Sequence, residues 1–135
     1  MIAASGSSLS PRLLHAYRRT EYRSGEAVAR IGRRSAQIDA VLRAMGARRG
    51  AFLTAWNPAS RRLPAAMNRR RQDRLTALLR RMPWRAAEGG WRGWREAHVL
   101  AAGDPRRLAT LARRFGQNAI VAIAMGRAAR LVLLR

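Results

Sequence analysis

The chain contains no cysteine and only two histidines, and these shortages restrict the chemistry it can perform. Without cysteine there is no disulfide, no thiolate nucleophile and no zinc site built on thiolates. His15 and His98 lie far apart in the sequence and lack the close spacing of a recurrent metal motif. We therefore expect no metal site.

Lysine is absent and acidic residues are scarce, with 28 arginines against 7 acidic residues and a net charge of +21. Two interpretations stay open. Arginine forms paired hydrogen bonds with phosphate, so the charge can mark a surface that binds nucleic acid or another polyanion. The coding bias of a GC-rich genome accounts for arginine in place of lysine, but not for the excess of basic over acidic residues. The densest patch we can place on one element is Arg69, Arg70, Arg74, Arg80 and Arg81.

Long apolar runs are absent as well. The longest candidate, residues 118–134, is interrupted by Gly126, Arg127 and Arg130 and falls short of the roughly 18 apolar residues of a membrane span. The start, "MIAASGSSLS", has small residues and serines rather than the pattern of a signal peptide. We expect a flexible lead-in over residues 1–13, a single domain over residues 14–135, a cytoplasmic location and no membrane partner.

Turn and capping residues divide the chain into its expected elements. Ser24-Gly25 predicts a hairpin between strands in 13–22 and 26–31, and Gly126 predicts a closing hairpin. Helices are expected from Ser35 to Gly46, from Pro64 to Pro83, and after the Asp104-Pro105 start. "GAFLTAW" predicts a buried strand, and residues 84–103 predict two short strands. The order ββ-α-β-α-ββ-α-ββ indicates an α+β domain: a mixed, largely antiparallel sheet covered by three helices.

The same periodicity predicts which helical side chains are buried. Six apolar residues are expected to pack against the sheet: Leu75, Leu78 and Leu79 from the second helix, and Leu108, Leu111 and Phe115 from the third.

Several polar residues follow apolar runs, where packing alone does not require them. Asn57 and Ser60 follow the "GAFLTAW" strand, Asn68 lies in the first turn of the next helix, and Gln117-Asn118 precede a buried strand. Turn and capping chemistry explains Asn57, Ser60 and Gln117-Asn118, and a solvated surface position explains Asn68. A ligand site explains them together, because such sites often lie where strand ends meet helix starts.

Glu96 and His98 lie two residues apart on an expected strand, so their side chains share a face. Glu96 either pairs with nearby arginines or acts with His98 as a catalytic acid or base. Trp84, Trp91 and Trp94 alternate with Arg85, Arg92 and Arg95, a pattern that either stacks unpaired bases or covers one end of the sheet. No glycine-rich phosphate loop, nucleophile elbow or paired-carboxylate motif occurs, so we expect no cofactor and the residues specify no reaction.

Four segments together resemble a known family. They are "AYRRTEYR", "FLTAWNPAS" with Asn68 following it, "WREAHVL" and "LARRFGQNAIVAI". They are similar to the bacterial family called domain of unknown function 3293, from about residue 14 onward. The resemblance implies no activity. By position it singles out Thr54, Asn57, Ser60, Asn68, Glu96 and Gln117 as a shared site.

Two functions therefore stay open. The first is a binding module for an anionic partner, nucleic acid or another polyanion, with a polar pocket around the Asn-Pro-x-Ser loop. The alternative is a small enzyme or sensor that acts on a nucleotide or phosphorylated metabolite through Asn57, Ser60, Glu96 and Gln117. The first requires arginines clustered on one face, and the second requires these polar side chains to converge in a cleft.

Overall fold

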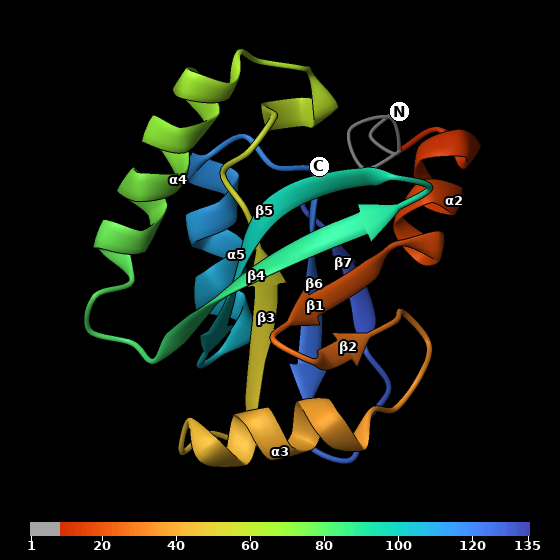
Figure 1. The fold of residues 1–135 in the computed structure, drawn as a ribbon, viewed down its shortest axis with the longest axis vertical. Helices are drawn as coiled ribbons and strands as arrows, with labels where there is room; N and C mark the ends of the chain where they lie inside the picture. Colours follow the sequence, from red (N-terminus) through yellow and green to blue (C-terminus); the bar gives the residue numbers. More distant parts are fainter. Residues whose placement is uncertain (1–8) are drawn as a thin grey trace.

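A computed structural model describes residues 9–135, in which four α-helices pack on a seven-stranded antiparallel sheet (Figure 1). The helices are α2 (Pro11–Arg19), α3 (Ala36–Ala44), α4 (Ala65–Leu78) and α5 (Pro105–Arg114), with a 3₁₀ turn η1 (Pro58–Ser60). The strands are β1 (Glu21–Ser24), β2 (Ala27–Ala29), β3 (Arg49–Leu53), β4 (Trp84–Trp91), β5 (Trp94–Ala102), β6 (Ala119–Ala124) and β7 (Arg130–Leu133). The α+β class is confirmed, with four helices in this range where three were predicted.

The sheet has the order β2-β1-β4-β5-β3-β6-β7 and curls until its two edges meet. Ile31, just after β2, forms an isolated parallel bridge with Ala129, just before β7. The backbone N–H of Gly32 donates to the Ala129 carbonyl at 2.8 Å, which fastens this closure. All paired strands are antiparallel. The sheet was predicted to be mixed, but in residues 9–135 the isolated bridge between Ile31 and Ala129 is its one parallel contact.

The predicted first strand is wrong over most of its length, because Pro11–Arg19 forms helix α2. Ser10 caps this helix by accepting a hydrogen bond from the Leu13 N–H at 3.1 Å, and Pro11 occupies the first helical position, where its missing N–H costs nothing. Part of the expected lead-in, residues 1–8, lies outside the described residues, and residues 11–13 are the first turn of α2. The turn at Ser24-Gly25 is where it was predicted.

Other local predictions are confirmed. Ser35 caps α3 and Asp104 caps α5, each by accepting a hydrogen bond from a backbone N–H of the first turn. Gly116 follows α5 with φ +70°, a conformation that strains any other L residue except asparagine or aspartate. Strands β4 and β5 are longer than predicted because Gly89 and Gly90 lie inside β4 rather than in a loop.

The sheet carries an apolar core on each face. Leu75 and Leu79 from the α4 region and Leu108 from α5 pack on the outer face with Leu53 and Val99. On the inner face of the curl lie three strand residues, Tyr22, Phe52 and Leu100, together with Ile38 and Leu42 from α3. Successive strand residues point to opposite faces, so Phe52 and Leu53 belong to different cores.

The predicted buried face of α4 is partly wrong. Leu75 and Leu79 are fully buried, but Leu78 is 51% exposed. The inward stripe runs through Asn68, Leu75 and Leu79, at spacings of seven and four residues. The sequence prediction assumed that only apolar residues face inward. It therefore assigned Leu78 to the buried face and left out Asn68. The inward position of Asn68 matters for the site described next.

Candidate functional site

A cavity of about 320 Å³ opens between α2 and the turn that joins β4 to β5. It lies at the end of the sheet where β3 finishes and where β5 and β6 begin. Antiparallel pairing brings these three strand ends to one edge, although they are far apart in the sequence. The cavity collects most of the polar residues that the sequence singled out: Thr54, Asn57, Ser60, Glu96, His98 and Gln117.

Asn68 and Asn118 do not line the cavity but hold residues that do. Asn68 is 1% exposed and accepts a hydrogen bond from the Asn57 backbone N–H at 2.9 Å. Its side-chain NH₂ donates to Asn57 Oδ1 at 2.8 Å and to the Leu63 carbonyl at 3.2 Å. Asn118 Nδ2 donates to Ser60 Oγ at 3.0 Å. The two asparagines are therefore positioning residues.

The hydrogen bonds of Asn57 fix the direction in which its amide points. Its Oδ1 accepts from Asn68 and also from the Leu63 backbone N–H at 2.9 Å. With the oxygen held in this way, the NH₂ group points toward Glu96 and donates to Oε2 at 3.3 Å. Asn57 has φ +46°, a left-handed conformation that asparagine tolerates better than most residues.

Glu96 is the carboxyl group of the cavity, and it has no arginine partner among residues 9–135. Glu21, Glu88 and Asp104 all form ion pairs with arginine in this range. The Asn57 amide is the hydrogen-bond donor to the Glu96 carboxylate in the described chain. Burial raises the pKa of Glu96 to about 7, and the Asn57 hydrogen bond opposes this rise. The pairing interpretation of Glu96 is therefore wrong, and a titratable carboxyl faces the cavity.

His98 follows Glu96 by two residues on β5, so both side chains lie on the same face of the strand. His98 is uncharged at neutral pH. Burial lowers the pKa of His98 to about 4. Its Nδ1 lies 3.1 Å from the Glu96 carbonyl oxygen, which can only accept a hydrogen bond, so Nδ1 carries the proton and Nε2 a lone pair. The Tyr22 ring meets the imidazole edge-on, with centroids 5.6 Å apart. Burial also raises the pKa of Tyr17, so its hydroxyl stays protonated beside the cavity.

The loop from Asn57 to Ser60 combines turn chemistry with backbone strain. Ala59 and Ser60 have φ values of +53° and +61°, which non-glycine residues rarely adopt. The turn after α5 holds the loop: the Ala59 N–H donates to the Gly116 carbonyl at 2.8 Å, and Gln117 Nε2 donates to the Trp56 carbonyl at 3.1 Å. Strain of this kind persists where surrounding contacts over-determine the conformation, and it clusters at ligand sites.

Thr54 lines the cavity, but its hydroxyl is used within the protein. It donates to the Ala97 carbonyl at 2.6 Å and accepts from the Trp56 N–H at 3.0 Å, which ties the end of β3 to β5. The sequence prediction missed Arg71 and Gln72, which bond the carbonyl and the N–H of Ala55 at 2.8 and 2.9 Å. Their spacing after Asn68 on one helix was the available signal.

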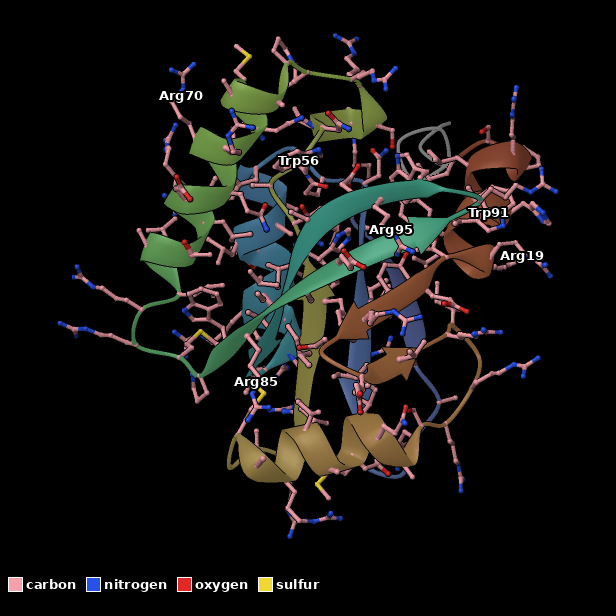
Figure 2. The ribbon with its side chains drawn as sticks, viewed as in Figure 1. Arg19, Trp56, Arg70, Arg85, Trp91 and Arg95 are labelled. Atoms are coloured by element: carbon pink, nitrogen blue, oxygen red, sulfur yellow. The ribbon has the colours of Figure 1, made fainter. Side chains whose placement is uncertain are left out.

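The predicted arginine patch lies away from this cavity. Arg69, Arg70 and Arg74 are exposed on α4, and Arg80 and Arg81 follow the end of that helix rather than belonging to it. Figure 2 shows Arg70 on the α4 side of the molecule, whereas Trp91 and Arg19 lie at the opposite side beside α2.

Within residues 9–135, no group of three or more histidine or acidic side chains gathers as a metal site would require.

The fold and the site together define an α+β protein with a titratable carboxyl in a mostly apolar cavity beside α2. The chain belongs to the family described as "Protein of unknown function (DUF3293)", whose model matches residues 53–120. The matched range contains every polar residue predicted for the site, but it excludes α2. No curated protein and no solved structure matches the chain. In the described part of the chain, no helix has the length and apolar character needed to cross a membrane.

Proposed function

We propose that this protein is a small enzyme or sensor that binds a nucleotide or phosphorylated metabolite in the cavity and exchanges a proton with it through Glu96. The observation that supports this most is that no arginine within residues 9–135 pairs with the Glu96 carboxyl, although the chain has a net charge of +21. A carboxylate paired with arginine stays ionised at neutral pH. A carboxyl with a pKa of about 7 is present in both forms, which suits a general acid or base.

The neighbouring groups have separate roles in this proposal. Asn57, held by Asn68, fixes the Glu96 carboxyl, while the Tyr17 hydroxyl and the His98 Nε2 offer one donor and one acceptor to the ligand. Trp94 at the mouth is 47% exposed and supplies a flat apolar surface on which a ring can stack. A mostly apolar cavity with a few convergent polar groups is the usual form of a small-molecule site. A bacterial, cytoplasmic setting is part of the proposal.

The test is a thermal-shift screen of nucleotides and sugar phosphates, followed by binding measurements on three proteins: wild type, Glu96→Gln and Glu26→Gln. Glu26 is exposed on the β1–β2 turn, so its substitution removes the same charge away from the cavity. We expect the compound that stabilises wild type to bind Glu96→Gln about tenfold to a hundredfold more weakly, since a hydrogen bond to a charged group is lost. Glu26→Gln should bind like wild type. Equal affinity for both variants, or no stabilising small molecule, would contradict the proposal.

A second candidate, binding of nucleic acid or another polyanion through α4, is favoured by a different observation. Arg69, Arg70 and Arg74 are exposed and form no ion pair within residues 9–135. Such arginines can contact successive phosphates.

For this candidate, replacing Arg70 and Arg74 together by glutamine should reduce the salt dependence of binding. The slope of log affinity against log salt concentration should fall by about one to two units on duplex or single strands. The matched control is the Arg12 and Arg135 pair, both exposed near the ends of the chain. The same reduction from the control pair would mean that the charge acts as diffuse background, and this candidate would be rejected.

A further inference from the structure

A second hollow, of about 410 Å³, adjoins the mouth of the cavity and is lined by arginine. Three separated parts of the chain contribute to it: the last turn of α2, the segment after β2, and the β4–β5 turn with the start of β5. Figure 2 shows Arg19, Trp91 and Arg95 at this end of the molecule. Its six arginines face one acidic residue, Glu21: they are Arg18, Arg19, Arg30, Arg33, Arg92 and Arg95. We call this hollow the arginine cleft.

The charges of the arginine cleft are largely uncompensated. Glu21 pairs with Arg30, and Glu88 pairs with Arg95 at 3.1 Å. The other four arginines of the cleft form no ion pair with any residue in 9–135. Like charges held together repel each other, so a bound anion would relieve a cost that the protein otherwise carries. Guanidinium groups match phosphate oxygens with paired hydrogen bonds, which makes phosphate the anion of best fit.

Arg92 holds a strained position at the edge of the cleft. It has φ +52° and is followed by Gly93 at φ +76°, the pattern of a two-residue hairpin turn whose first place normally takes asparagine or glycine. The guanidinium carbon lies 4.8 Å from the centre of the Trp91 ring. An arginine costs stability at this position, and strain of this kind gathers at functional sites.

The cleft and the cavity share a wall. Trp91 and Trp94 line both hollows: Glu96 lies in the cavity, and the six arginines lie in the cleft. Trp94 is 47% exposed although it is a large apolar side chain. One molecule can therefore place an uncharged ring against Trp94 at the mouth of the cavity while its phosphate reaches the arginines.

We propose that the arginine cleft binds the phosphate group of the ligand whose uncharged part occupies the cavity. This rests on the proposed function, and it makes the ligand a phosphorylated small molecule with the phosphate at one end. A cavity of about 320 Å³ is at the lower end of the size range of ligand pockets, which favours one nucleoside-sized group over a chain of them. The 5′ end of an oligonucleotide also carries a phosphate beside a nucleoside, so the experiment must distinguish the two ligands.

The experiment measures thermal stabilisation by inorganic pyrophosphate at constant ionic strength, so that the phosphate group is tested without the rest of the ligand. The cleft variant is Arg19→Gln with Arg92→Asn, and the control is Arg12→Gln with Arg135→Gln, which removes the same charge from exposed positions outside the cleft. Asparagine suits the turn at position 92, so the cleft variant should fold. We expect the pyrophosphate dissociation constant to rise about tenfold to a hundredfold in the cleft variant and to stay unchanged in the control.

The outcomes separate this proposal from the one on which it rests. Equal weakening in both double variants, or no saturable binding by wild type, overturns the arginine cleft. Glu96→Gln should bind pyrophosphate with wild-type affinity, because Glu96 lies in the cavity and not in the cleft. Pyrophosphate binding therefore tests the cleft even if the proposed role of Glu96 is wrong. A nucleoside monophosphate that binds more tightly than its nucleoside, with the gain lost in the cleft variant, supports the small molecule. If a 5′-phosphate increases affinity only when it is attached to an oligonucleotide, and not when it is attached to a nucleoside, the small-molecule proposal is overturned. The ligand would then be the 5′ end of a nucleic acid.

Discussion

Replacing Asn68 by leucine is expected to lower the free energy of unfolding by about 3–5 kcal/mol and to remove the Asn57–Glu96 arrangement. Leucine has a similar volume, so the change removes hydrogen bonds rather than packing. The Asn57 N–H, the Asn57 Oδ1 and the Leu63 carbonyl each lose a hydrogen bond with this side chain. A buried polar group left without its partner costs about 1–3 kcal/mol, and the Asn57 amide becomes free to turn away from Glu96.

The matched control is Arg69→Leu, which places the same side chain on the exposed position next to Asn68 in α4. Its effect on stability should lie within about 0.5 kcal/mol. Urea unfolding gives both values, and the chemical shift of the Asn57 side-chain amide reports whether its contact with Glu96 persists. Equal stability of the two variants would show that the Asn68 hydrogen bonds contribute little.

Replacing Glu96 by glutamine is expected to stabilise the protein at pH 7 and above by about 3 kcal/mol relative to wild type. Glutamine keeps an acceptor for the Asn57 amide but cannot ionise. The Glu96 pKa is 4.5 in the unfolded chain and about 7 in the folded protein. Between these values the unfolded chain releases its proton while the folded protein retains it, so wild type loses stability as the pH rises. The gain from glutamine should vanish below pH 4.5 and be constant above pH 7.

His98 has the opposite dependence on pH. Its pKa is 6.5 in the unfolded chain and about 4 in the folded protein, so wild type loses stability as the pH falls from 6.5 to 4. The two residues therefore nearly cancel in wild type, whose stability should change little between pH 4.5 and 6.5. Glu96→Gln should show the rise with pH that His98 alone produces. Urea unfolding across this range measures the difference, and a difference independent of pH would contradict the raised pKa of Glu96.

The sequence alone determined those parts of the molecule that depend on local chemistry. Ser35 and Asp104 start helices because their side chains accept from the backbone N–H groups of the first turn, whatever the rest of the fold does. Gly116 ends α5 because it adopts positive φ at little cost. Asn57, Ser60 and Gln117, which line the cavity, could be singled out from the sequence because they are polar and follow or precede buried runs. The residue pattern also led to the family.

Only the tertiary structure decided the features that depend on residues distant in the sequence. Helix α2 covers the cavity because it packs beside residues distant in the sequence, with the His15 and Trp91 ring centroids 5.7 Å apart. Asn68 faces inward because its partners, Asn57 and Leu63, lie on the loop that α4 packs against. The electrostatic state of Glu96 depends on which of 28 arginines reach it, and none within residues 9–135 does. The arginine cleft exists because the fold brings together three segments that composition shows only as net charge.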